Sequence, residues 1–205
     1  MATIQEQLVE YGRKVVAAGL TAGTGGNISA RDVQQTVWMK PSGFSLEELA
    51  PQDLCGVHLK TGKQTLGRHK VTAEVNMHVA VYRARADVNA VFHLHPPWLN
   101  GVISAGVPFR PLTSEVIFYL GRYTMIPYVA PTTLALADCV AEVVTEHDTI
   151  FMPHHGVLAV GTDIRQAWHR CMVAEDEAKA QVAAAMIGKP QYLTAEQIEE
   201  LRRLG

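Results

Sequence analysis

Apolar residues recur every three or four positions in four segments of the chain, which is the spacing of one face of an α-helix. The helices predicted in this way cover residues 4–16, 72–86, 133–147 and 163–187. Asp163 is a good N-cap residue for the fourth helix, and Gly188 ends it. Thr194 and Gln197 form a capping box, which predicts a last short helix.

Shorter runs rich in β-branched and aromatic residues predict strands between these helices. The strongest is VNAVFHLH at residues 88–95, which a pair of prolines follows. Further strands are predicted at residues 35–39, 55–59, 127–129, 149–152 and 156–160. Helices and strands alternate without an internal repeat or a linker, so we expect one α/β domain over residues 1–205.

Composition narrows the class of protein. The chain has 205 residues, of which 48% are hydrophobic and 19% charged, an ordinary globular mixture. A net charge of −2 gives no bulk attraction to nucleic acid or to an anionic membrane. We expect no signal peptide, no membrane span, and three reduced cysteines in a cytoplasmic protein.

Two of the nine histidines stand out by their spacing. His93 and His95 lie two positions apart on a predicted strand, so their side chains face the same way and could share a metal ion. The pair His154 and His155, at the end of another strand, could supply a third ligand. Spacing does not separate these two, and we favour His155 partly because Gly156 lets the backbone approach closely.

Three neutral imidazoles would leave a fourth metal position open for substrate, which is typical of a catalytic rather than a structural site. The alternative is a strand that merely carries two half-buried histidines. The other histidines are isolated, and we expect them on the surface or hydrogen-bonded in the core: His58, His69, His78, His147 and His169.

One acidic residue and several glycines complete the candidate chemistry. Glu74 would lie in the first turn of its helix, where the helix dipole favours a carboxylate, and beside a metal it could move a proton at carbon. Residues 23–27 could present several backbone N–H groups to a phosphate. Ser42 with Gly43, and Thr72 at a helix start, are further candidates.

Taken together, these segments resemble the class II aldolase/adducin-head family, which includes fuculose-1-phosphate and rhamnulose-1-phosphate aldolases. The resemblance is carried by GTGGNIS at 23–29, KPSG at 40–43, Glu74 in TAEVNMH, HLHPP at 93–97 and HHG at 154–156. Their order and separations match over nearly the whole chain, and the set is far more specific than any one member.

The resemblance implies a three-layer αβα fold with a largely antiparallel central sheet, and a homotetramer with active sites at subunit interfaces. It implies that His93, His95 and His155 bind Zn²⁺, which Mn²⁺ or Co²⁺ could replace, because the histidine before the glycine is the family's ligand. Glu74 would be the catalytic acid/base. The residues implied around the substrate phosphate are Gly26, Asn27, Ser42, Gly43, Thr72 and Ala73.

The implied activity is that of a metal-dependent aldolase. It would cleave a ketose 1-phosphate, fuculose-1-phosphate-like or a 5-deoxy or methylthio pentulose 1-phosphate, to dihydroxyacetone phosphate and an aldehyde via a metal-stabilised enediolate. Alternatives on the same fold are a decarboxylase of a 3-oxo acid, a ribulose-phosphate 4-epimerase, a dehydratase and a non-catalytic adducin-like binding module. Arg110 and Arg122 are candidates for a basic cluster that would favour decarboxylation, although ordinary surface positions fit them as well.

The sequence departs from the family pattern at two places. Sugar-phosphate aldolases often have two serines before the glutamate, whereas this chain has Thr72 and Ala73, so Ala73 offers a phosphate only its backbone N–H. The fuculose-type enzyme places a tyrosine from the neighbouring subunit on the aldehyde oxygen, and its ungapped match is Ser114, beside Glu115. The sequence therefore does not predict the structure of the aldehyde portion of the substrate.

Overall fold

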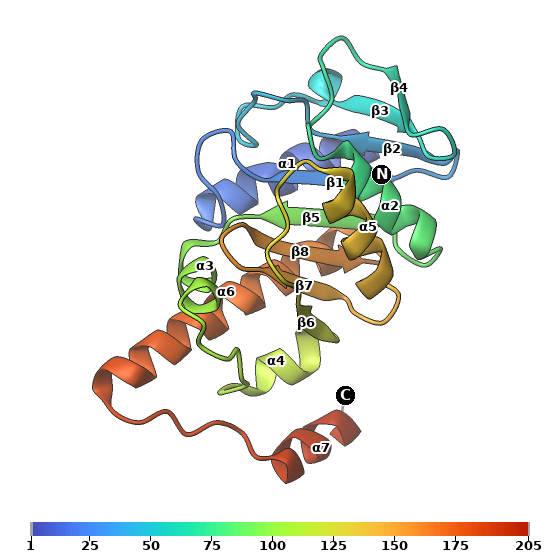
Figure 1. Ribbon diagram of the computed structural model, residues 1–205. Helices are drawn as coiled ribbons and strands as arrows, with labels where there is room; N and C mark the ends of the chain where they lie inside the picture. The colour runs from blue at the N-terminus through green and yellow to red at the C-terminus, as the bar shows by residue number, and fades with distance from the viewer. Residues whose placement is uncertain (1, 205) are drawn as a thin grey trace.

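The computed structural model describes residues 2–204, which form an eight-stranded sheet in the order β4-β3-β2-β1-β5-β8-β7-β6 (Figure 1). The strands are β1 (Asn27–Arg31), β2 (Thr36–Met39), β3 (Cys55–His58), β4 (Lys63–Leu66), β5 (Ala90–Leu94), β6 (Tyr123–Met125), β7 (Thr149–Met152) and β8 (Gly156–Gly161). All neighbouring pairs in this sheet are antiparallel except β6 and β7. The predicted largely antiparallel sheet is confirmed.

Helices cover both faces of the sheet (Figure 1). The helical segments are α1 (Ile4–Ala17), the 3-10 turn η1 (Pro51–Asp53), α2 (Val75–Ala84), α3 (Pro97–Ser104), α4 (Ser114–Tyr119), α5 (Leu134–Val143), α6 (Ile164–Ile187) and α7 (Ala195–Leu204). One buried hydrophobic cluster joins α2 and α5 to one face, and a second joins α1, α3, α4 and α6 to the other. The three-layer αβα architecture is therefore also confirmed.

Central strands are buried on both sides because helices cover both faces. All five residues of β5 are buried, so its sequence reads as a continuous apolar run rather than an alternating one. The helix ends follow local signals. The Gln166 N–H donates to Asp163 Oδ1 over 2.7 Å, and Thr194 and Gln197 exchange the two hydrogen bonds of a capping box.

One predicted strand was wrong. Residues 127–129 form no strand; the edge strand is instead β6, which pairs with β7 in parallel. Pro127 begins the predicted segment, and a proline has no backbone N–H to donate to a ladder. Six elements of the described chain were not predicted at all: β1, β4, β6, η1, α3 and α4. In β1, small and polar residues lie at buried positions, which hides the strand pattern.

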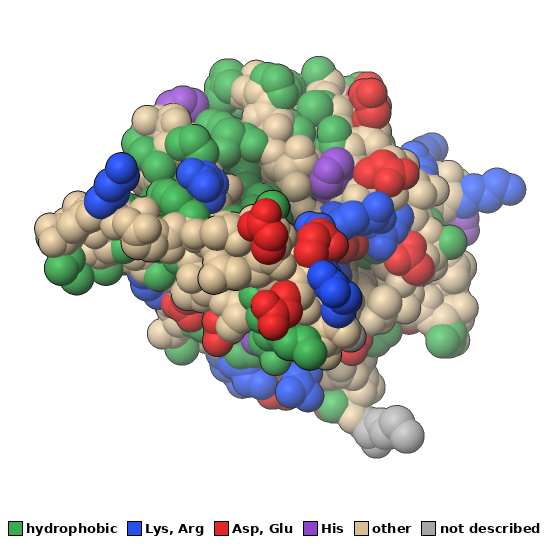
Figure 2. Space-filling model, turned by 90° about the horizontal axis from the view of Figure 1, so that it is seen from below, with side chains coloured by type: hydrophobic (Ala, Val, Ile, Leu, Met, Phe, Trp, Pro, Cys, Tyr) green, Lys and Arg blue, Asp and Glu red, His purple; other side chains and the backbone are tan. Residues whose placement is uncertain are grey.

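The helix predicted from residue 72 begins at Val75, so Glu74 is its N-cap residue rather than part of its first turn. All three cysteines in the described part of the chain are unpaired, as predicted. Among residues 2–204, no helix is long and apolar enough to cross a membrane. On the face shown in Figure 2, acidic and basic side chains are interspersed, in keeping with the small net charge.

Candidate active site

Three imidazoles converge near the end of β5. His93 lies in β5, His95 follows that strand directly, and His155 lies in the turn between β7 and β8. His93 Nε2 is 3.0 Å from His95 Nε2 and 3.1 Å from His155 Nε2. Three nitrogens bound to one zinc at ~2.0–2.1 Å in tetrahedral geometry would lie roughly 3.3 Å apart. The three side chains therefore fit a single divalent ion.

Hydrogen bonds and burial prepare these rings as ligands. His93 is fully buried, and its Nδ1 donates to Val157 O over 3.1 Å, which leaves the Nε2 lone pair directed at the centre of the cluster. Burial lowers the pKa of His95 to about 4, with smaller contributions from His93 and His155. A neutral imidazole is the form that binds a metal.

Only one of the two adjacent histidines reaches the cluster. The His154 backbone has φ 64°, the left-handed turn conformation, and its exposed ring lies 6.3 Å from the Tyr128 ring. The His155 ring lies 4.5 Å from the His93 ring, centroid to centroid. The structure thus places His155, and not His154, with the other two candidate ligands.

The next residue explains why this turn can approach β5. A Cβ atom on Gly156 would lie 2.2 Å from Leu94 O and 2.8 Å from His95 Cδ2, so only glycine fits. The close approach expected at Gly156 is confirmed. Asn100 of α3 also holds the turn, because its Nδ2 donates to the His155 carbonyl over 3.2 Å.

The Glu74 carboxylate lies directly beside the imidazoles. Its Oε2 is 3.2 Å from His93 Nε2, and its Oε1 is 3.3 Å from His155 Nε2 without hydrogen-bond geometry. Asn27 Nδ2 donates to Oε2 over 2.8 Å. Burial raises the pKa of Glu74, but its contacts with His155, His93 and Asn27 outweigh burial and hold the pKa well below its usual range. The hydrogen bond from the Asn27 amide favours the ionised form of the carboxylate.

A cavity of about 370 Å³ opens beside this cluster. Its lining includes Glu74, His95, His155 and all of the predicted phosphate residues: Gly26, Asn27, Ser42, Gly43, Thr72 and Ala73. A larger cavity of about 500 Å³, near Arg31 and Asp163, has no comparable cluster in its lining. We take the smaller cavity as the candidate active site because convergent titratable groups mark function better than volume does.

Backbone hydrogen bonds divide the phosphate candidates. The Ser42 and Thr72 N–H groups donate to the Lys70 and Lys40 carbonyls. Within residues 2–204, no acceptor pairs with the N–H groups of Gly26, Gly43 and Ala73. Those three amides are left to bind an anion. Phosphate binding by these residues stays a prediction.

The sequence reasoning missed Lys40, the first residue of KPSG. The side chain is buried and lines the cavity, and its Nζ donates to the Gly26 carbonyl over 2.8 Å and to the Thr24 carbonyl. Burial lowers its pKa to about 8, opposed by the charge of Glu74. The ammonium form of a lysine at this position could form an ion pair with an anion in the cavity. The place of Lys40 in the KPSG segment, three residues before Gly43, was the only available signal.

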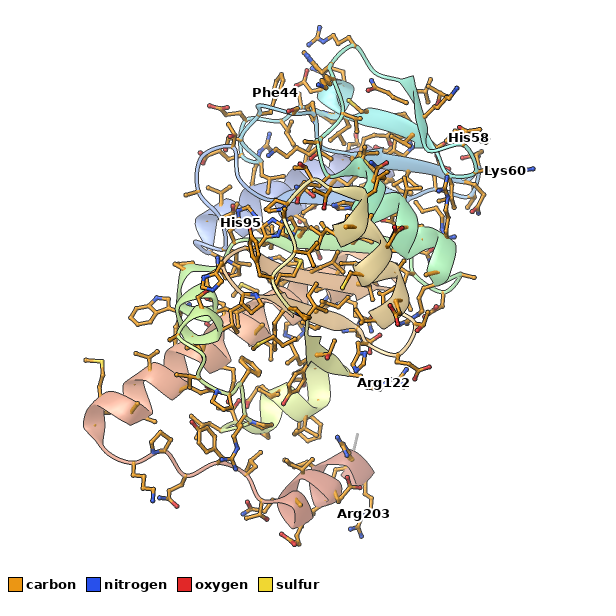
Figure 3. All side chains as sticks on the ribbon, viewed as in Figure 1. Phe44, His58, Lys60, His95, Arg122 and Arg203 are labelled. Carbon is orange, nitrogen blue, oxygen red and sulfur yellow. The ribbon has the colours of Figure 1, made fainter. Side chains whose placement is uncertain are left out.

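Four further candidates do not line this cavity in the described chain. Ser114 and Glu115 lie at the start of α4. Arg110 stacks on the Tyr192 ring, and Arg122 pairs with Glu146 at 3.1 Å. Figure 3 shows Arg122 well apart from His95. Within residues 2–204, therefore, no arginine cluster lines the candidate site.

Comparisons with known proteins agree with this architecture. Residues 6–182 match the family described as the Class II Aldolase and Adducin N-terminal domain. The chain is 32% identical to the 5-deoxy-D-ribulose 1-phosphate aldolase of Bacillus thuringiensis serovar kurstaki, over 97% of this chain and 93% of that protein. It is 28% identical to the 3-oxo-tetronate 4-phosphate decarboxylase of Escherichia coli, over 98% and 95%. A solved L-fuculose 1-phosphate aldolase superposes with a TM-score of 0.89 at 25% identity, over 100% and 97%.

Proposed function

The chain belongs to the class II aldolase and adducin N-terminal domain family, and on that premise we propose that it is a metal-dependent aldolase. Its substrate is a ketose 1-phosphate of the 5-deoxypentulose class, cleaved to dihydroxyacetone phosphate and an aldehyde. The observation that carries the proposal is the Glu74 carboxylate, 3.2 Å from one of three convergent imidazoles and beside a cavity that contains a buried lysine. A binding module needs no such proton-transfer group.

The proposed chemistry divides between the histidines and Glu74. His93, His95 and His155 would hold a divalent ion, which would supply Lewis-acid stabilisation of negative charge on the substrate oxygens. Glu74 carries the proton. In the condensing direction it takes a proton from the hydroxymethyl carbon of dihydroxyacetone phosphate, which requires the ionised form that the structure favours. In the cleaving direction the carboxylate takes up the proton released by the hydroxyl group that becomes the aldehyde, and then delivers a proton to the carbon of dihydroxyacetone phosphate.

A panel of ketose 1-phosphates tests the reaction. We expect release of dihydroxyacetone phosphate, fastest from 5-deoxyribulose 1-phosphate, and loss of that release after prior chelation. A coupled assay that reduces the product measures it directly. Rates with fuculose 1-phosphate and with a methylthio pentulose 1-phosphate show which aldehyde portion of the substrate the enzyme prefers. No release from protein loaded with zinc, manganese or cobalt would overturn the aldolase proposal.

Decarboxylation is the second candidate, favoured by the relative that is 28% identical over nearly the whole chain. Carbon dioxide release from 3-oxo-tetronate 4-phosphate by the same metal-loaded protein would identify it. The absence of an arginine from the lining of the candidate cavity, within the described chain, counts against recognition of a second anionic group there. Aldol cleavage therefore remains the first proposal.

The position of Lys40 leads to a separate prediction about phosphate recognition. We expect Lys40→Met to raise KM for the phosphorylated substrate by about 10-fold or more at pH 7, because it removes a charge-assisted hydrogen bond. In the unchanged protein, KM should rise above pH 8, since the pKa of Lys40 is about 8 and the ammonium is lost above it. Steady-state kinetics over roughly pH 6.5–9.5, a range that spans the pKa of Lys40, measure both effects.

The exposed Lys60 provides the matched control for this substitution, and Figure 3 shows it far from His95. Lys60→Met should leave KM and its pH dependence unchanged. A Lys40→Met protein that keeps the rise in KM above pH 8 would show that another group titrates. The homotetramer with interfacial active sites stays a prediction from the family resemblance.

A further inference from the structure

A chain of buried polar side chains runs from Glu74 into the space between β1 and α2. Asn27 Nδ2 lies 2.8 Å from Glu74 Oε2, and Asn27 Oδ1 lies 2.5 Å from His78 Nε2. His78 Nδ1 is 2.7 Å from Ser29 Oγ, which is 2.8 Å from the Tyr82 hydroxyl. Ser29 and His78 are fully buried, and Tyr82 is 2% exposed.

The periodicities of a strand and of a helix bring these five hydrogen-bonded side chains together. Asn27 and Ser29 lie two apart on β1, and so face the same side. Glu74, His78 and Tyr82 lie four apart along one side of α2, beginning at its N-cap residue. Packing one face of the helix against one face of the strand therefore places five polar groups in a line.

The hydrogen-bond direction is the same at every link. Asn27 Nδ2 donates to Glu74 Oε2, so the amide presents its nitrogen to Glu74 and its oxygen to His78. His78 Nε2 must then carry the proton. Burial lowers the pKa of His78 to about 3, so the ring is neutral and its Nδ1 accepts from Ser29. Ser29 in turn accepts from Tyr82, and every donor points towards Glu74.

The consequence for Glu74 follows from the two ends of the amide. Without a donor at His78, the Asn27 oxygen is buried without a partner, and the amide is free to rotate away from Glu74 and pair that oxygen elsewhere. Glu74 Oε2 then loses the donor that holds it beside His93. A fully satisfied buried network prevents this rotation.

We propose that His78 and Ser29 are positioning residues that hold the Asn27 amide as a donor to Glu74, and so fix the carboxylate beside the three-histidine cluster. The kinetic consequence of this proposal rests on the proposed function. The tautomer that it requires does not.

The first test measures that tautomer without any activity assay. Ring nitrogen NMR of ¹⁵N-histidine-labelled protein, with the His78 signals assigned by their loss in His78→Gln, should show a neutral ring protonated at Nε2. A ring protonated at Nδ1 would overturn the proposal, because Asn27 would then have to turn its nitrogen towards His78 and its oxygen towards Glu74.

The second test separates positioning from simple stability. His78→Leu should lower kcat for dihydroxyacetone phosphate release by about 10–100-fold, with KM and metal content unchanged. His78→Gln should recover most of this loss, because its amide nitrogen can donate to Asn27. Tyr82→Phe is the matched control. It removes a buried hydrogen bond at the end of the side-chain network farthest from Glu74, and should keep kcat within about 3-fold of the unchanged protein.

Ser29→Ala carries the test if His78→Leu fails to fold, since it removes a single oxygen. We expect kcat about 3–10-fold lower at unchanged KM. Wild-type kcat in both Ser29→Ala and His78→Leu, or an equal loss in Tyr82→Phe and His78→Leu, would overturn the positioning role. Failure of the unchanged protein to release dihydroxyacetone phosphate would instead overturn the proposed function, and the tautomer measurement would still decide the role of His78.

Discussion

Glu74→Gln is expected to lower turnover by about 10²–10⁴-fold while the protein keeps its divalent metal. The substitution preserves the size of the side chain and removes the group that accepts and returns a proton. The three imidazoles keep their positions, since His93 is held by the Val157 carbonyl and His155 by the turn that precedes β8. Turnover of the best ketose 1-phosphate, together with metal content by mass spectrometry, measures both parts of the prediction.

The matched control is Glu10→Gln, which makes the same chemical change at an exposed position of α1. It should leave kcat unchanged. A Glu74→Gln protein with nearly wild-type turnover would exclude Glu74 as the acid/base. A Glu74→Gln protein that loses its metal would show that the carboxylate contributes to metal binding, and the loss of turnover would then say nothing about proton transfer.

His155→Ala is expected to weaken metal binding at least about 100-fold and to abolish activity with it, because loss of an outer hydrogen-bond partner alone costs about 10–100-fold. The structure brings His155 Nε2 to 3.1 Å from His93 Nε2, so removal of this ring opens one side of the site. Competition with a zinc-binding dye gives the affinity. Full metal occupancy in His155→Ala would mean that the third ligand lies elsewhere.

The neighbouring histidine offers an unusually close control. His154→Asn should bind metal as tightly as the unchanged protein, because the His154 ring is exposed and turned towards Tyr128. Asparagine is preferred to alanine here because the residue has φ 64°, a conformation that asparagine tolerates. Equal losses of metal in the two variants would point to collapse of the turn rather than to a missing ligand.

Local signals carry much of what could be predicted about this chain. The capping residues Asp163 and Thr194 act within one helical turn, so their effect is visible in the sequence and is found in the structure. The two-residue spacing of His93 and His95 is equally local, since alternation along a strand is a property of the backbone. The order and spacing of all the motifs together indicated the family, and through it the αβα fold.

Long-range packing decided the rest of the candidate site. The choice between His154 and His155 depends on a positive φ at one residue and on the approach of Gly156 to Leu94, which only folding brings about. Lys40 reaches the cavity only because folding buries it beside the Gly26 carbonyl. The edge strand β6 likewise depends on its pairing with β7.

The sequence by itself determined the αβα class, the family, and the set of residues from which a metal site and an acid/base can be built. The tertiary structure alone decided how these residues meet: Glu74 lies beside two imidazoles, and behind it lies a buried His78 that no sequence pattern singled out. The physical reason is the range of the interactions. Periodicity and capping act within a few residues, whereas hydrogen bonds such as the one from Asn27 to Glu74 exist only after β1 and α2 have packed together.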